Sequence, residues 1–349
     1  MQIMNILEID NLKTCFYTDN GIVQAVRGIS FNVEKGEVVG IVGESGSGKS
    51  VTMFSIMGLL VENGFILEGS IKFNGITLFD NKNKKESIKG RKKQHERKMN
   101  HVRGKEIGMI FQDPMTFLNP ILTIEYQLTE GLQQHLHLSH HECKKRALDL
   151  LRIVEITNPE NRLKQYPFEL SGGMRQRIII AMALICHPKL LIADEPTTAL
   201  DVTIQAQILD LIRDLREKFE MSIILVTHDL GVVASTCTKI LVMYGGLIVE
   251  QGSDREIFYK KRHPYTSGLL KSITSPKGNQ KEKLKPIEGS PPDSLKLPKG
   301  CAFVDRCPYA MRICLDCPPP MIKLTETHSC RCWLIDNRVI KKKGNVSLD

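Results

Sequence analysis

The eight residues GESGSGKS, at positions 43–50, have the types and spacing that phosphate binding requires. They match the pattern G-x-x-x-x-G-K-[ST] and lie between a strand-like run and a helix-like one. Glycines let the backbone curl so that successive N–H groups face phosphate oxygens at a helix N-terminus. We expect Lys49 to reach the β- and γ-phosphates of a nucleotide and Ser50 to ligate Mg²⁺. The predicted nucleotide and Mg²⁺ contacts of this loop are Gly43, Ser45, Gly46, Ser47, Gly48, Lys49 and Ser50.

The strand-like run LLIADEP, at positions 190–196, contains an acidic pair near its end. A carboxylate at the end of a buried strand can face the loop that holds the phosphates. Asp194 is suited to bind Mg²⁺, directly or through water, and Glu195 is suited to polarise an attacking water as a general base. Two carboxylates that cap the next helix are the structural alternative. That alternative does not explain why the pair occurs together with the phosphate-binding loop.

An α/β fold must position these motifs. Helical patterns alternate with strand-like runs, several of them apolar throughout, which predicts a mainly parallel sheet covered by helices on both faces. The strand-like runs lie at 36–43, 190–195, 222–229 and 239–252. Residues 120–165 predict an inserted helical subdomain. Prolines and lysines from about residue 264 predict a linker that continues to a group of cysteines.

Composition adds broad limits. A chain of 349 residues with 42% hydrophobic and 25% charged residues can bury a sizeable core. No apolar run approaches the roughly 18 residues of a membrane span, so any membrane work needs a partner. Residues 81–105 carry eleven Lys or Arg against two Glu, which accounts for the net charge of +9. A solvated loop is the default interpretation, contact with anionic lipid or RNA is the alternative, and no nucleic-acid partner is expected.

Further motifs give the chain a family resemblance. LSGGMRQR, at 170–177, resembles the signature of ATP-binding cassette (ABC) ATPases and precedes LLIADEP in that family's order. Gln112 in FQDP is similar to the Q-loop of these ATPases, Asp201 in ALD to their D-loop, and His228 in VTHD to their switch histidine. The resemblance implies a P-loop NTPase core with an N-terminal antiparallel β portion and an inserted helical subdomain.

The resemblance also implies a composite active site. In ABC ATPases two domains close head to tail on two ATP molecules, so the signature of one domain contacts the ATP that the other domain holds. Gln112 would then sense Mg²⁺ and the attacking water, and His228 would contact the γ-phosphate, which with Glu195 makes the catalytic set. An aromatic residue stacks on adenine in this family, and Tyr17 is preferred here to Phe16. The predicted contacts with the partner's ATP are Ser171, Gly172, Gly173 and Asp201.

A narrower resemblance covers positions 42–332. MIFQDPMTFLNP, HPYTSGLL and PKGCAFVDRCPYAMRIC are similar to the ATP-binding subunits of dipeptide, oligopeptide and nickel importers. The implied function is ATP hydrolysis that drives peptide uptake from an extracytoplasmic solute-binding protein through two transmembrane permease subunits. The chain would lie at the cytoplasmic face of the cell membrane and pair with a second, related ABC ATPase as a heterodimer. Nickel or another small solute, a soluble ABC ATPase of translation or DNA repair, and a redox-sensing module are the alternatives.

Six of the ten cysteines lie at positions 301–332, a density that indicates a metal site. The gaps between Cys301, Cys307 and Cys314 are too wide for the short C-x₂₋₄-C knuckle of structural zinc. With Cys332 they supply four thiolates, the number that a 4Fe–4S cluster takes, and the resemblance associates such a set with this cluster. Zn²⁺ bound with Cys317 or Cys330 is the alternative, as is a pair of unliganded cysteines.

The predicted domains follow from these motifs. An ABC nucleotide-binding domain is expected at 1–263, with its helical subdomain at about 113–182. A C-terminal extension that carries the cysteine motif is expected at 264–349.

Overall fold

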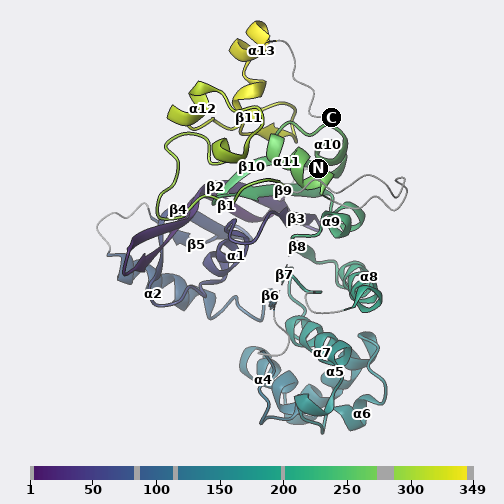
Figure 1. Cartoon of the computed structure of the whole chain (residues 1–349). Helices are drawn as coiled ribbons and strands as arrows, with labels where there is room; N and C mark the ends of the chain where they lie inside the picture. Colours follow the sequence, from purple (N-terminus) through teal and green to yellow (C-terminus); the bar gives the residue numbers. More distant parts are fainter. Residues whose placement is uncertain (1–3, 82–86, 113–116, 198–200, 273–286, 344–349) are drawn as a thin grey trace. The chain divides into compact units, whose positions relative to one another are not determined.

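The structure is a computed structural model that describes residues 4–81, 87–112, 117–197, 201–272 and 287–343 (Figure 1). The chain divides into two compact units, and each is described by itself. The first unit consists of Met1–Ile6, Glu34–Glu37 and His95–Val226. The second unit consists of Leu7–Val33, Val38–Gln94 and Thr227–Asp349.

The first unit contains a parallel series of strands in the order β8-β7-β6. Every residue of β6, β7 and β8 is buried, as expected of strands that are covered on both faces. The elements of this unit are β6 (Ile107–Ile110), α4 (Ile124–Leu136), α5 (His140–Ile153), α6 (Pro159–Arg162), η1 (Pro167–Glu169), α7 (Gly172–Leu184), β7 (Leu190–Asp194), α8 (Val202–Phe219) and β8 (Ser222–Thr227).

Four helices of the first unit form the predicted helical insertion, drawn in teal in Figure 1. Helices α4 and α5 pack against each other and against α7. Side chains fix where these helices begin: Thr123 caps α4, and Ser139 with Glu142 forms a capping box at α5. The sequence therefore specifies these helices locally, through their caps and their amphipathic faces.

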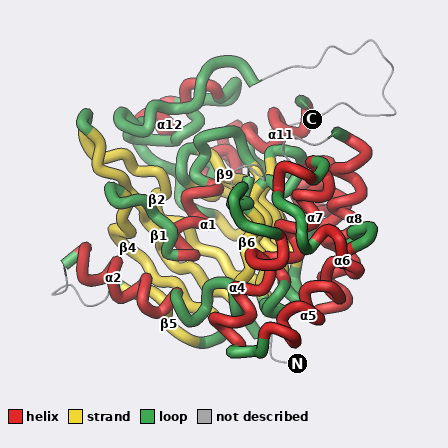
Figure 2. The backbone as a smooth tube through the Cα atoms, turned by 90° about the horizontal axis from the view of Figure 1, so that it is seen from below, coloured by secondary structure: helices red, strands yellow, loops and turns green. Residues whose placement is uncertain are grey.

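The second unit begins with an antiparallel sheet in the order β2-β1-β4-β5, which Figure 2 shows as adjacent strands. Helix α1 contacts β4. This sheet confirms the N-terminal antiparallel portion that the family resemblance implied. Its elements are β1 (Asn5–Thr18), β2 (Gly21–Glu34), α1 (Lys49–Met57), β4 (Gly64–Phe73) and β5 (Ile76–Asp80).

A second series of strands in this unit has the order β11-β12-β10-β9-β3. β3 (Val38–Val42) pairs in parallel with β9 (Lys239–Tyr244), and with the parallel strands of the first unit this pair confirms the predicted α/β fold. The prediction of one strand over 239–252 is wrong. Gly245 and Gly246 adopt positive φ angles, so the chain turns there and β10 (Leu247–Ser253) returns antiparallel to β9.

The predicted linker also differs from the structure. Residues 264–271 form helix α11, which begins with a proline at its first position and buries Tyr265 completely. Residues 273–286 of the predicted linker lie outside the described residues. The remaining elements of the second unit are α9 (Leu230–Thr236), α10 (Asp254–Tyr259), α11 (Pro264–Lys271), η2 (Val304–Arg306), α12 (Arg312–Asp316), β11 (Ile322–Lys323), β12 (Ser329–Cys330), η3 (Trp333–Ile335) and α13 (Asn337–Lys343).

The basic run at 81–105 is not a loop throughout. Residues 88–99 form helix α2 (Ile88–Met99), which buries His95 and Met99, whereas 82–86 lie outside the described residues. Lys92 donates its Nζ to the carbonyls of Val61 and Gly64, at 2.8 and 3.2 Å. One cation of the run is therefore used inside the protein. Among the residues that the structure describes, no helix is both long and apolar enough to span a membrane.

Candidate functional site

The phosphate-binding loop follows β3 and leads into α1, as its motif predicts. Gly48 caps α1 with a φ of 98°, and a Cβ atom there would lie 2.6 Å from the carbonyl oxygen of Ala25, so only glycine is accommodated. Lys49 is buried, and its Nζ donates to the carbonyls of Gly43 and Glu44, at 2.7 and 3.0 Å. The ammonium group therefore lies over the loop.

The chemistry of the loop matches a phosphate ligand. The Ser47 side chain is only 4% exposed, and its hydroxyl has no hydrogen-bond partner among the described residues. A buried hydroxyl without a partner costs free energy, and phosphate oxygens would supply acceptors for it. Ser50 lies at the second position of α1, where its half-buried hydroxyl can serve Mg²⁺, while Ser45 and Gly46 are exposed.

Two other residues predicted to contact ATP also lie in the second unit. Tyr17 is 52% exposed and stacks on Phe65 with a centroid distance of 4.5 Å, which leaves ring surface for a base. Phe16 is less exposed and lies against Gly64. His228 follows β8 as an exposed residue, and the next residue, Asp229, caps α9.

The predicted base and its neighbours lie in the first unit. Asp194 is the buried last residue of β7, and Glu195 follows with a φ of 48°, a strained conformation for a residue with a side chain. The Glu195 N–H donates to the carbonyl of Val226 at 2.8 Å, which holds the turn in place. The Gln112 amide Nε2 donates to Glu195 Oε2 at 3.0 Å. The structure thus brings together two of the three predicted catalytic residues.

The signature residues open a helix. Ser171 caps α7 by accepting the N–H of Met174 at 3.4 Å, and Gly172 and Gly173 form its first turn. A Cβ atom on Gly172 would meet nothing within 4 Å, and Ser171 and Gly172 are exposed. An exposed helix N-terminus offers backbone N–H groups and positive potential to an anion. Asp201 uses its carboxylate to cap α8, accepting the N–H of Ile204 at 3.0 Å.

The four cysteines of the predicted cluster gather in the C-terminal extension. The Cys301 N–H donates to the carbonyl of Cys314 at 2.8 Å. Burial raises the pKa of Cys332 to about 12, and the charges of Cys301, Cys307 and Cys314 add to the shift. Burial likewise raises the pKa of Cys307 to about 11, again with Cys301 and Cys314 contributing. Each thiol is therefore close enough to others of the set to affect their ionisation.

The two competing cysteines differ from each other. Cys317 is exposed, and its carbonyl accepts the Trp333 indole N–H at 2.9 Å. Cys330 is fully buried, and burial raises its pKa well above the usual value, with added contributions from Glu250 and Cys332. Among the described residues, no three Cys, His, Asp or Glu side chains are arranged as they stand to hold a metal ion.

Sequence reasoning missed several buried polar residues of the second unit. Glu250 is fully buried and accepts the N–H groups of Arg262 and His263, at 2.6 and 3.1 Å, and it also pairs with His328 Nε2 at 2.8 Å. Arg306 forms an ion pair with Glu44 of the phosphate-binding loop. Each of these residues lies in or beside a stretch noted for other reasons, but no spacing rule links them.

Comparison with known proteins defines the class of this protein. Residues 26–198 match the family described as ABC transporter, and residues 249–314 match the oligopeptide/dipeptide transporter C-terminal region. A solved dimer of the ATP-binding cassette MJ0796 with ADP and Pi is similar, with a TM-score of 0.61 and 27% identity over 71% of this chain and 99% of that one. The protein is an ABC ATPase.

The similarity to curated proteins extends over nearly the whole chain. The oligopeptide transport ATP-binding protein OppD of Bacillus subtilis is 51% identical over 96% of this chain and 90% of its own length. The dipeptide transport ATP-binding protein DppD of the same organism is 49% identical, over 95% of this chain and 96% of its own. OppD of Salmonella typhimurium is 49% identical, over 90% and 89%. The chain belongs to the family of oligopeptide and dipeptide transport ATP-binding proteins.

Proposed function

We propose that this chain hydrolyses ATP at a composite site, and that hydrolysis drives the import of di- or oligopeptides across the cytoplasmic membrane. One observation carries the ATP assignment: the phosphate-binding loop holds a buried Ser47 hydroxyl without a partner beside the folded-in Lys49. The names of the relatives favour peptides over nickel or another small solute. The same similarity argues against a role in translation or DNA repair.

The second unit supplies groups that hold the nucleotide. Lys49 would release the loop carbonyls and pair with the β- and γ-phosphates, and Ser47 would donate its hydroxyl to a phosphate oxygen. Ser50 would ligate Mg²⁺. Tyr17 would stack on adenine, because its exposed ring is already held in place by Phe65. His228 would contact the γ-phosphate and hold the geometry of the reacting groups.

The first unit supplies the base. Glu195 would accept a proton from the attacking water, and Asp194 would help to hold Mg²⁺, which supplies charge neutralisation for the phosphates. Gln112 already donates to the Glu195 carboxylate, so it is placed to orient the base and to respond when water and Mg²⁺ enter. Because Gln112 lies just before the helical subdomain in the sequence, it can also transmit the nucleotide state to that subdomain.

A second ATPase domain would complete each site. The exposed N-terminus of α7, with Ser171, Gly172 and Gly173, would bind the γ-phosphate of the partner's ATP, and Asp201 would lie at the same interface. We propose a related but different ATPase chain as the partner. Intact-mass analysis of the complex purified from native membranes should find one copy of this chain, and a functional complex with two copies would contradict the heterodimer.

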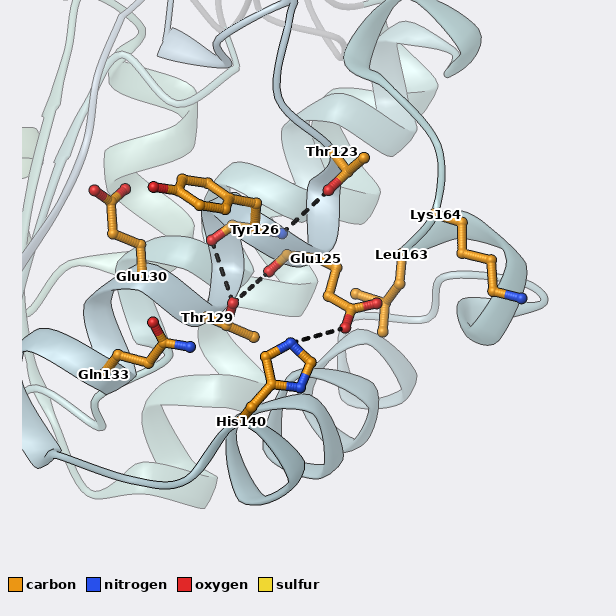
Figure 3. A pocket seen from close by; sticks show the side chains of 9 residues that line it. All are labelled: Thr123, Glu125, Tyr126, Thr129, Glu130, Gln133, His140, Leu163 and Lys164. Carbon is orange, nitrogen blue, oxygen red and sulfur yellow. Dashed lines mark hydrogen bonds and ion pairs between the residues drawn. The ribbon is translucent and has the colours of Figure 1, made fainter.

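The helical subdomain offers a surface for the permease subunits. A cavity of about 460 Å³ is lined by residues of α4 and α5, and Figure 3 shows Glu125, Tyr126 and Glu130 of α4 around it. The same unit exposes Ile121 and Phe168, with 78% and 70% of their surface accessible. Large exposed apolar side chains mark interaction surfaces. We assign this surface to a cytoplasmic segment of a permease, which would place the chain as a peripheral subunit at the membrane.

The cysteine extension is proposed to bind a 4Fe–4S cluster. Cys301, Cys307, Cys314 and Cys332 match the ligand number, and the mutual effect on their pKa values supports a shared site. A bound cluster would supply cross-links between distant parts of a small segment that buries little core by itself. Zn²⁺ is the second candidate, because the buried Cys330 lies next to the set.

The test of the ATPase assignment is Glu195→Gln in the assembled transporter. The amide keeps the size of the side chain but removes the base, so ATP hydrolysis should fall by about two orders of magnitude or more while ATP still binds. Glu220→Gln is a matched control, because Glu220 lies in the same unit with a φ of 49° and is exposed. Near-normal hydrolysis by the Glu195→Gln protein would sink the assignment.

A further inference from the structure

Arg306 of the cysteine extension contacts the phosphate-binding loop. It lies directly before Cys307 in the sequence, 262 positions after its partner Glu44. Its Nη1 donates to Glu44 Oε2 at 2.7 Å, and its Nη2 donates to Glu44 Oε1 at 3.0 Å. The two bonds run from one guanidinium to one carboxylate, which is the geometry that makes an arginine pair directional as well as strong.

The guanidinium is held on every side by the second unit. The Arg306 side chain is only 5% exposed. Its Nε donates to the carbonyl of Glu288 at 3.0 Å, and its Nη2 also donates to the carbonyl of Ile287 at 3.1 Å. Its Nη1 contacts the Tyr244 hydroxyl at 3.3 Å, and the group lies over the Tyr244 ring, 5.7 Å from the centroid. Arg306 is therefore a fixed point and not a mobile surface charge.

Glu44 joins this fixed point to the residue that binds phosphate. Its carbonyl accepts Lys49 Nζ at 3.0 Å and the Ser47 N–H at 3.2 Å. Its own N–H donates to the hydroxyl of Tyr265, a buried residue of α11, at 2.9 Å. The side chain, N–H and carbonyl of one residue thus connect two C-terminal segments to the loop that carries Lys49 and Ser47.

We propose that Arg306 is a positioning residue for ATP binding: by holding the Glu44 carboxylate, it fixes the phosphate-binding loop in the conformation that presents Lys49 and Ser47 to the phosphates. ATP affinity then depends on the folded cysteine extension. The proposal rests on the proposed role of the loop. It does not depend on which metal the cysteines bind, because the Arg306–Glu44 pair is made by protein atoms alone.

Steady-state kinetics of the assembled transporter separates this role from a general structural one. Arg306→Met keeps side-chain volume but loses the ion pair, and it should raise KM for ATP about tenfold, the effect of losing a charge-assisted hydrogen bond, with kcat within about twofold. Arg306→Lys keeps the charge but loses the bidentate geometry, and it should give an intermediate KM. Glu44→Gln should raise KM to a similar extent, and the double variant should be no worse than either single one.

Arg338→Met is the matched control. Arg338 lies in the same extension, forms a bidentate pair with Asp336 at 2.9 and 2.8 Å and lies over the Trp333 ring, but it has no contact with the loop. Its KM for ATP should equal that of the wild type. Equal KM values for the Arg306→Met and wild-type proteins would overturn the proposal, as would additive effects in the double variant.

Two further outcomes are distinguishable. If Arg306→Met lowers kcat and thermal stability together, Arg306→Lys decides: a raised KM with wild-type thermal stability supports the proposal, and a wild-type KM overturns it. Lys49→Ala tests the underlying loop assignment in the same assay. If Lys49→Ala leaves ATP binding intact, the loop assignment fails; if it abolishes binding while Arg306→Met has no effect, only the positioning role fails.

Discussion

The phosphate-binding loop and the cysteine extension lie in the same compact unit, yet different contacts hold them. The loop is fixed mainly by its own backbone: Ser47 N–H donates to the Glu44 carbonyl, and Gly48 adopts a conformation that only glycine tolerates easily. The extension is attached by side chains that span long sequence separations. His328 reaches Glu250 across 78 positions. A short motif can therefore specify the loop, whereas the extension depends on the folded chain.

Burial sharpens this difference. The Glu250 carboxylate is fully buried, which is tolerable only because two backbone N–H groups and His328 satisfy it. His263, in the same network, is also buried, and its Nδ1 accepts the N–H of Tyr265 at 3.1 Å. The loop has no comparable ionic network apart from Arg306 and Glu44. The extension should therefore respond to metal loss and acid more strongly than the loop does.

The largest expected effect separates the two regions by removing one proposed ligand. Cys301→Ser should abolish the brown colour of anaerobically purified protein and its content of about four iron and four sulfide per chain. ATP binding at Lys49 should survive. Cys317→Ser is the control, because Cys317 is exposed and outside the proposed set, and it should keep the iron. Colourless wild-type protein with one tightly bound zinc would reject the cluster and leave the ATPase assignment standing.

Acid should test the buried network of the extension. Burial lowers the pKa of His263 to about 4, despite the raising effect of Glu250. The unfolded chain, with a pKa near about 6.5, binds a proton in the window where the folded one does not, so stability falls as pH drops from about 6.5 toward 4, by at most about 1.4 kcal/mol per pH unit. Urea unfolding at pH 7.0 and 5.5 measures this fall.

His263→Asn isolates the contribution of the histidine. An asparagine oxygen can still cap α11, but the residue no longer titrates. The loss of stability between pH 7.0 and 5.5 should be smaller in this variant by about 1.4 kcal/mol. Identical pH dependence in the variant and the wild type would show that His263 does not carry the effect.

The smallest expected effect concerns the edge of the nucleotide site. Tyr17→Ala removes the proposed adenine platform and should weaken ATP binding about five- to tenfold, the range for loss of one base stack. Tyr17→Phe keeps the ring and should bind ATP as the wild type does. Equilibrium titration with ATP measures both variants. Unchanged affinity in Tyr17→Ala would assign the stacking role to another residue.

The sequence predicted what depends on neighbouring residues. The phosphate-binding loop, the strands that end at Val42 and Asp194, and the cap of the signature helix lie where the motifs and apolar runs placed them. Each of these features is fixed within a few residues, by glycine conformation, helix capping or burial on both faces of a strand.

The remaining features depend on tertiary contacts. The apolar run over 239–252 hid a turn at Gly245 and Gly246, and the proline-rich start of α11 was taken for a linker although Pro264 occupies a position that favours helix initiation. The pairing of Arg306 with Glu44 could not be predicted, since nothing local in either segment indicates a partner 262 positions away.

The most direct test of the account is ATP-dependent uptake of a labelled oligopeptide into proteoliposomes. The vesicles contain this chain, its partner ATPase and both permease subunits, with the solute-binding protein on the side from which the peptide enters. We predict ATP-dependent uptake with the wild type and with Glu220→Gln, and uptake lower by about two orders of magnitude with Glu195→Gln. Equal uptake with Glu195→Gln, or ATP hydrolysis without peptide uptake in the wild type, would contradict the account.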